Sequence, residues 1–140
     1  MNTVWLHPSK DVGYDAICEF VSERIWGKSR DLPLGTAMAI VEKGKVVAGL
    51  VYNNYDIDAG VIEISGASDT PRWLTKPILK EMFEFPFDEL GCQAVIMRVD
   101  TRDGRLSRIL KAIGFVRHDI PRLRGRNEAE ALFVLGDDVW

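Results

Sequence analysis

The segment from Asp103 to Gly114 carries the clearest helical pattern in the sequence. Its apolar residues recur at the spacing that places them on one face of a helix: Leu106, Ile109, Leu110 and Ile113. Asp103 is suited to cap the start of this helix, and Gly114 is suited to end it, because glycine tolerates the left-handed conformation. Strand-like segments flank the helix at 93–99 and 115–118. A chain that alternates between the helical spacing of apolar residues and the alternating pattern of strands is expected to fold as a mixed α/β protein.

The rest of the chain continues the same alternation of helical and strand periods. Two more helices are expected, at 12–26 and around 74–83. Five more strands are expected, at 4–6, 37–41, 46–52, 60–65 and 131–135. Residues 53–56 are expected to break the chain between two strands, and a basic loop is expected before the last strand. We therefore expect an α/β fold with one mixed, predominantly antiparallel sheet, helices on both of its faces, and a single domain that spans 1–140.

The sequence offers two possible N-cap residues for the second helix. In one interpretation Thr70 caps it, with Pro71 at the first helical position, where proline is favoured. In the other, Thr75 is the cap and Pro77 lies in the first turn. Pro86 is expected to kink or end this helix, because its ring clashes with the preceding turn.

Composition excludes several classes of protein. The 140 residues are 46% hydrophobic and 28% charged, which is ordinary for a globular domain. The two cysteines, Cys18 and Cys92, are too few for a disulfide scaffold or a zinc finger, so we expect buried thiols and no metal site. No apolar run approaches membrane-spanning length, and the first residues do not resemble a signal peptide. A cytoplasmic protein without a membrane segment is therefore expected.

Basic residues are concentrated in one fifth of the chain. Half of the 18 Lys and Arg residues lie between 98 and 126: Arg98, Arg102, Arg105, Arg108, Lys111, Arg117, Arg122, Arg124 and Arg126. Three aspartates oppose them in the same segment: Asp100, Asp103 and Asp119. Such a region attracts anions, although a solvated helix face followed by a basic loop would give the same composition.

The second half of the chain resembles a known family. Residues 90–95 read Leu-Gly-Cys-Gln-Ala-Val and lead through a strand to Ser107, and Ile-Leu-Lys-Ala-Ile-Gly-Phe follows at 109–115. This order is similar to the C-terminal half of GCN5-related (GNAT-fold) N-acetyltransferases, especially the branch that acetylates protein N-termini and small amines. The order of the upstream elements agrees with the family too. The resemblance implies acetyl-CoA as co-substrate and an amine as acceptor.

The resemblance also implies where the cofactor binds. The pantetheine arm would pair with the strand at 60–65, through Ile62, Ile64 and Ser65, where this strand splays from 93–99. The pyrophosphate would lie on backbone N–H groups near the next helix, at Ser68, Thr70, Arg72, Trp73, Leu74, Thr75 and Lys76. Gly104, Arg105 and Arg108 would hold the cofactor arm and meet its 3′-phosphate or an acidic acceptor. The sequence departs from the family pattern at Trp73, where a glycine is usual, and at Gly104, where an asparagine is common.

Two residues are candidates for the chemistry of acetyl transfer. Glu63 is the only carboxylate in an otherwise apolar strand, and this strand often supplies the base in the resembled family. It would accept the amine proton or position a water. The backbone of Ile64 would polarise the thioester carbonyl, and Ser107 is the nearest polar candidate for the general acid. The structural alternatives are a solvent-facing Glu63 and a Ser107 hydroxyl that bonds its own helix backbone.

The sequence therefore supports two hypotheses. The first is an acetyl-CoA-dependent N-acetyltransferase that acts on an amine of a small molecule or protein. The second is a catalytically inactive GNAT-like binding module whose basic C-terminal region binds nucleic acid or an acidic partner. The missing glycines of the phosphate loop favour the second, whereas the motif from Lys111 to Phe115 does not separate the two, because it mainly shapes the core. A homodimer is compatible with either, because this fold often pairs through its C-terminal strands.

Overall fold

The computed structural model describes residues 1–33 and 35–140. One seven-stranded sheet contains β1 (Asn2–Leu6), β2 (Thr36–Glu42), β3 (Lys45–Asp56), β4 (Val61–Ser68), β5 (Ala94–Asp100), β6 (Val116–Gly125) and β7 (Glu128–Gly136). The helices are α1 (Tyr14–Trp26), α2 (Lys76–Glu84) and α3 (Gly104–Ile113), with a 3₁₀ turn, η1 (Pro71–Trp73), before α2 and a π-helical turn, η2 (Phe85–Glu89), after it. The seven strands and three helices therefore follow the expected order.

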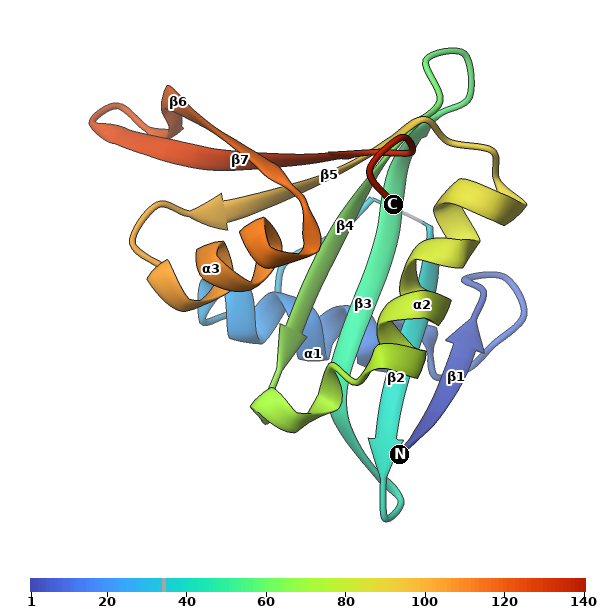
Figure 1. Cartoon of the computed structure of the whole chain (residues 1–140). Helices are drawn as coiled ribbons and strands as arrows, with labels where there is room; N and C mark the ends of the chain where they lie inside the picture. Colours follow the sequence, from blue (N-terminus) through green and yellow to red (C-terminus); the bar gives the residue numbers. More distant parts are fainter. Residues whose placement is uncertain (34) are drawn as a thin grey trace.

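The sheet is mixed and predominantly antiparallel, as the sequence predicts. Its strand order is β1-β2-β3-β4-β5-β7-β6, and each neighbouring pair is antiparallel except β4 and β5. Figure 1 shows that β4 and β5 start close together and then diverge. The only parallel pair of the described sheet is therefore also the place where the sheet opens.

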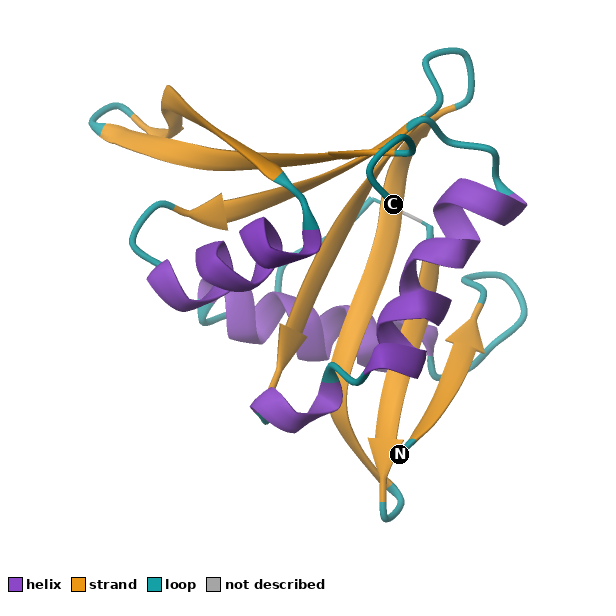
Figure 2. Ribbon diagram, in the orientation of Figure 1, coloured by secondary structure: helices purple, strands orange, loops and turns teal. Residues whose placement is uncertain are grey.

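Helices cover both faces of the sheet, which confirms the prediction. The helix α1 buries Ile17 and Val21 against Ala39 and Val51, on the face that lies behind the sheet in Figures 1 and 2. On the front face, α2 and α3 pack over a second core, which includes these fully buried residues: Met38, Leu50, Phe83, Val95 and Phe133. The alternation of apolar residues along the strands thus supplies one core to each face.

Both caps that the sequence leaves open are used. The Thr70 hydroxyl accepts a hydrogen bond from the Arg72 amide at 3.3 Å and caps the 3₁₀ turn. The Thr75 hydroxyl accepts one from the Ile78 amide at 3.4 Å and caps α2. The chain therefore turns twice between β4 and α2, because each threonine is followed by a proline at a favoured helix start. The α-helix ends at Glu84, and Pro86 lies in the π-helical turn that follows, so the proline does end α2 as expected.

Two sequence-based predictions about loops are wrong. Residues 53–56 do not end the strand, because β3 continues to Asp56 and Asn53 pairs with Glu63. The expected basic loop before the last strand is β6, which reaches Gly125 and pairs with β7. This strand lies at the edge of the sheet, where polar residues and Pro121 are tolerated, so it lacks the apolar alternation that marks a strand in the sequence.

Within the described residues, the helices are too short and too polar to cross a membrane. The same part of the chain holds no group of three or more potential metal-binding His, Cys, Asp or Glu side chains. Both cysteines carry thiols: Cys92 is buried as expected, whereas Cys18 is only half-buried, so the expectation of a buried thiol is wrong there. Burial raises the pKa of both thiols. Neither thiol is therefore activated as a nucleophile.

Candidate active site

The divergence of β4 from β5 creates the site. The two strands pair over only three positions, from Val61 opposite Ala94 to Glu63 opposite Ile96. Beyond them β4 continues along β3, whereas β5 follows β7. From Ile64 onward the β4 edge that faces β5 pairs with no described strand. Its N–H and C=O groups are therefore open to a ligand that can pair with a strand.

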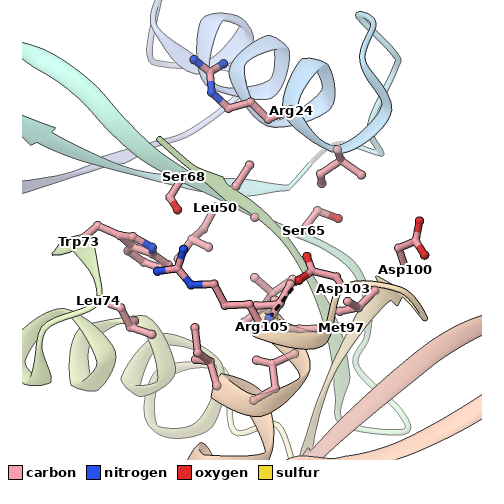
Figure 3. A pocket seen from close by; sticks show the side chains of 18 of the residues that line it. Arg24, Leu50, Ser65, Ser68, Trp73, Leu74, Met97, Asp100, Asp103 and Arg105 are labelled. Carbon is pink, nitrogen blue, oxygen red and sulfur yellow. Dashed lines mark hydrogen bonds between the residues drawn. The ribbon is translucent and has the colours of Figure 1, made fainter. Parts of the chain in front are cut away.

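A cleft of about 450 Å³ occupies the gap between β4 and β5 (Figure 3). Leu50, Ile64 and Met97 give it an apolar floor, and Leu106 and Ile109 add an apolar wall from α3. Its charged lining residues are Arg24, Asp69, Arg98, Asp100, Asp103, Arg105 and Arg124. The cleft therefore offers an apolar interior with charges at its margins, as small-molecule sites commonly do.

The structure brings about half of the predicted cofactor residues to this cleft. Those that line it are Ile64, Ser65, Ser68, Thr70, Trp73, Leu74 and Arg105. The others lie outside its lining: Ile62, Arg72, Thr75, Lys76, Gly104 and Arg108. Ile62 is buried in the paired part of β4, and the Arg72 side chain is 71% exposed and lies 3.7 Å from Glu42. Thr75 lies at the start of α2, where its hydroxyl serves as the cap.

The loop between β4 and α2 offers few backbone N–H groups to an anion. The Arg72 amide donates to Thr70, and the Thr75 amide donates to the Trp73 carbonyl at 3.0 Å. Pro71 and Pro77 carry no N–H group. Trp73 is half-buried, lines the cleft and packs against the front core. Side chains must therefore supply most of the positive charge for any phosphate bound there.

Arg24 supplies a charge that the sequence did not reveal. It comes from the last turn of α1 and binds Asp69, at the start of the loop, through two hydrogen bonds: Nε donates to Oδ1 at 2.6 Å, and Nη2 donates to Oδ2 at 2.8 Å. These bonds hold the pKa of Asp69 below its ordinary value and raise that of Arg24. Arg24 thereby fixes the loop to α1 and neutralises a carboxylate at the cleft margin.

Glu63 lies on the other face of the sheet from the front core. Its neighbours in the strand, Ile62 and Ile64, belong to that core, so the Glu63 side chain projects from the α1 face. It is half-buried, and the Nδ2 atom of Asn54 lies 3.5 Å from its Oε1. Directly across β3, Asn53 is 2% exposed, and neither polar atom of its side chain has a hydrogen-bond partner within residues 1–33 and 35–140. A buried amide without partners is costly, so these two residues mark a polar site beside the cleft.

The structure buries Ser107 in the wall of α3 rather than in the lining of the cleft. The side chain is 4% exposed, and its hydroxyl accepts a hydrogen bond from Nη1 of Arg117 at 3.3 Å. The hydroxyl thus bonds a side chain of β6 and not its own helix backbone. Its role as general acid stays a prediction.

Much of the basic region is neutralised within the fold. Four of its nine basic residues form ion pairs: Arg98 and Arg124 with Glu130, Arg102 with Asp100, and Arg117 with Asp119. The Arg102 pair holds the pKa of Asp100 well below its ordinary range. The concentration of arginines in the sequence therefore overstates the charge that a polyanion would meet.

Comparison with known proteins identifies the fold. Neither the models of protein families nor the sequences of curated proteins give a match. Solved structures do: ribosomal-protein-S5-alanine acetyltransferase from Vibrio fischeri is similar with a TM-score of 0.68 and 14% identity, over 99% of this chain and 93% of that one. This chain has the GNAT fold.

Other solved structures share the GNAT fold with this chain at low identity. A GCN5-related N-acetyltransferase from Brucella melitensis has a TM-score of 0.64 and 21% identity over 94% of this chain and 69% of its own. The dodecameric spermidine N-acetyltransferase from Vibrio cholerae has a TM-score of 0.61 and 10% identity, and the match covers 74% of this chain and 65% of that one. In three further structures this chain spans only 60%, 63% and 58% of the length. At such identities the likeness shows the fold alone.

The Arg24–Asp69 pair predicts a pH-dependent contribution to the stability of this GNAT fold. The pKa of Asp69 is depressed from 3.8, so the contribution is present above that pH and is lost as the pH falls through the lower folded value. Both side chains are partly exposed, so Arg24→Ala should cost only about 0.5 kcal/mol at pH 7. Urea unfolding at pH 7 and pH 3 measures this cost, which should shrink at pH 3.

The Asp69→Asn variant is the control for this pair. In that background Arg24→Ala should cost less than in the wild-type chain, because the charge that Arg24 binds is gone. An equal cost in both backgrounds, or a cost that does not change with pH, would show that Arg24 stabilises the chain through packing on the Phe20 ring, which lies 3.4 Å from its guanidinium carbon.

Proposed function

We propose that this chain is an acetyl-CoA-dependent N-acetyltransferase that acts on an amine of a small molecule or of a protein. The observation that carries the proposal is the open β4 edge beside a cleft of about 450 Å³. An extended arm with amide groups, such as pantetheine, can pair with that edge as an added strand would. The GNAT fold of the chain and of the acetyltransferases similar to it supports the same assignment.

The residues of the cleft fit acetyl-CoA in part. The apolar floor and the strand edge suit the pantetheine arm, whereas the loop at Pro71 and Arg72 offers few N–H groups to the pyrophosphate. Arg105 lines the cleft and takes part in no ion pair among the described residues, so its guanidinium is the strongest candidate for a phosphate contact. In this proposal arginine side chains replace part of the usual backbone cradle.

The chemistry would then proceed by direct transfer. The amine nitrogen forms a bond to the thioester carbon, the C–S bond breaks, and the thiolate of CoA leaves. Glu63 accepts the proton that the amine loses, directly or through a water, and N–H groups of β4 near Ile64 polarise the carbonyl. Ser107 donates to the leaving thiolate only if its hydroxyl turns away from Arg117. Otherwise the thiolate leaves unprotonated.

The proposed cofactor site is tested by closing the cleft at Gly66. This residue lines the cleft, and a Cβ at this position would collide with the side chain of Leu50. Saturating acetyl-CoA is expected to raise the melting temperature of the wild-type chain by several degrees, because it binds only the folded state. In Gly66→Val the affinity should fall by about tenfold or more, which lowers the shift at a fixed concentration by about 4 °C.

The control variant is Gly13→Ala, which replaces a glycine far from the cleft, where a Cβ meets nothing closer than 3.8 Å. It should respond to acetyl-CoA as the wild-type chain does. Acetylation of an amine panel, followed by mass spectrometry and by release of the CoA thiol, then tests the activity itself. If acetyl-CoA raises the melting temperature of neither the wild-type chain nor Gly13→Ala, the proposed function is wrong.

A further inference from the structure

A buried carboxylate holds two arginines at the edge of the cleft. Glu130 of β7 is 3% exposed, and it accepts hydrogen bonds from Nε of Arg98, on β5, and from Nη1 of Arg124, on β6, the latter at 2.6 Å. We refer to Arg98 and Arg124 as the arginine pair. One carboxylate between two guanidinium groups leaves a net charge of +1, and the shared partner holds like charges close together. A second anion would therefore be bound favourably beside them.

The arginine pair retains donors for such an anion. Each guanidinium uses one nitrogen on Glu130, and its other nitrogens make no hydrogen bond within residues 1–33 and 35–140. The two side chains are 44% and 21% exposed, and both line the cleft. The neighbouring carboxylate, Asp100, is already bound by Arg102 through both of its oxygens. These donors can therefore bind an anion from solution.

Arg98 and Glu63 project from the same face of the sheet. Met97 and Val99 belong to the front core, so Arg98, which lies between them, projects from the opposite face. Glu63 projects from that same face, and it is in register with Ile96, two residues before Arg98. Arg98 therefore lies roughly 7 Å further along the strand direction than Glu63. Because β4 and β5 diverge beyond this point, an acceptor that contacts both side chains must span this distance and the gap between the two strands.

We propose that the acceptor amine of this chain carries an acidic group, and that Arg98 and Arg124 bind that group while the amine lies at Glu63. This inference rests on the proposed function and names its substrate class: amines with a carboxylate or phosphate several bonds away. Guanidinium groups bind such oxyanions through paired hydrogen bonds, which fixes orientation as well as position. The same net charge of +1 repels diamines and polyamines. The acidic residue Glu130 sets the geometry by holding both arginines.

Matched acceptors test the proposal. One set contains short ω-amino acids from glycine to 6-aminohexanoate together with phosphoethanolamine, and the other contains alkylamines and diamines of the same lengths. Binding is measured by calorimetry on the protein saturated with CoA, and turnover is measured by release of the CoA thiol from acetyl-CoA. At least one acidic acceptor is expected to bind, and to react, about tenfold or more better than its matched amine.

Two variants assign the preference to the arginine pair. Arg98→Ala and Arg124→Ala each leave Glu130 with one arginine, so the buried charge stays paired and the fold is retained. Both residues line the cleft, so some loss of affinity for acetyl-CoA is expected in each variant. Each should nevertheless remove most of the preference for acidic acceptors, by a larger factor than any loss of affinity for acetyl-CoA. Arg126→Ala is the matched control, because Arg126 is exposed and lies outside the cleft lining. It should keep the preference.

The outcomes separate this inference from the proposed function. If acetyl-CoA binds and no acidic acceptor is preferred in either assay, the inference is wrong and the proposed function stands. If the variants lower the affinity for acetyl-CoA and leave the acceptor preference unchanged, the arginine pair binds a phosphate of the cofactor and the inference is again wrong. If acetyl-CoA itself fails to bind to the wild-type chain, the proposed function falls, and the inference falls with it.

Discussion

Replacing Glu63 by glutamine is expected to lower kcat for acetyl transfer by about 100-fold or more, because the amide cannot accept the proton that the amine loses. The affinity for acetyl-CoA should be unchanged, since Glu63 projects from the face opposite the front core and does not line the β4–β5 cleft. The amide is close in size to the carboxylate and sits on a half-buried strand position, so the fold should be retained. Turnover by release of the CoA thiol, together with calorimetry of acetyl-CoA, measures both effects.

The control for this change is Glu128→Gln on β7, which removes an exposed carboxylate outside the site. It should leave both kcat and the affinity for acetyl-CoA unaltered. A Glu63→Gln variant that turns over at the normal rate would remove Glu63 from the mechanism. A variant that loses acetyl-CoA binding together with turnover would assign Glu63 to the structure of β4 instead.

The sequence predicted best where the determinants of structure are local. The helix α3 begins and ends as its pattern requires: Asp103 accepts a hydrogen bond from the Leu106 amide at 3.0 Å, and Gly114 has a φ of 121°. Cap, apolar stripe and stop all lie within one segment, so the ends of α3 can be predicted without knowledge of any distant contact. The same holds for Thr70 and Thr75, whose two caps were both recognised although their joint use was not.

The extents of β3 and β6 could not be predicted, because strand pairing is decided by distant residues. Asn53 reads as a turn residue, yet Glu63 on the next strand holds it in the ladder. The β6 strand is held by β7, and its exposed edge needs no apolar alternation. Propensity is a weak guide where a neighbouring strand supplies the hydrogen bonds.

The candidate site was predicted in part for the same reason. Resemblance led to Ile64, Ser65 and Trp73, which do line the cleft. The arginine pair was missed as a unit, because Arg98 and Glu130 are separated by 32 positions. One local signal was present, however. Glu130 directly precedes the apolar run at 131–135, so its carboxylate is followed by buried residues, although Glu128 two positions earlier makes the pattern less distinct than that of Glu63.

The largest effect on stability is expected for Phe83→Ala. Phe83 of α2 is 0% exposed, and its ring centroid lies 6.2, 5.9 and 5.2 Å from those of Phe87, Phe115 and Trp140. Removing the ring deletes buried apolar surface and leaves a cavity among three aromatic rings that cannot all close in, which costs about 3–5 kcal/mol. Domains of this size are stable by about 5–15 kcal/mol, so the variant should lose a large part of its stability.

Urea unfolding of Phe83→Ala beside Phe83→Leu checks this prediction. Leucine refills part of the cavity, so its cost should be clearly smaller than that of alanine. Both variants lose the aromatic contacts and only alanine loses most of the volume, so a cost set by the cavity must be larger for alanine. Equal costs for the two variants would assign the stability to ring–ring geometry instead. Because α2 follows the loop that carries Trp73 and Leu74, any loss of acetyl-CoA affinity should track the loss of stability.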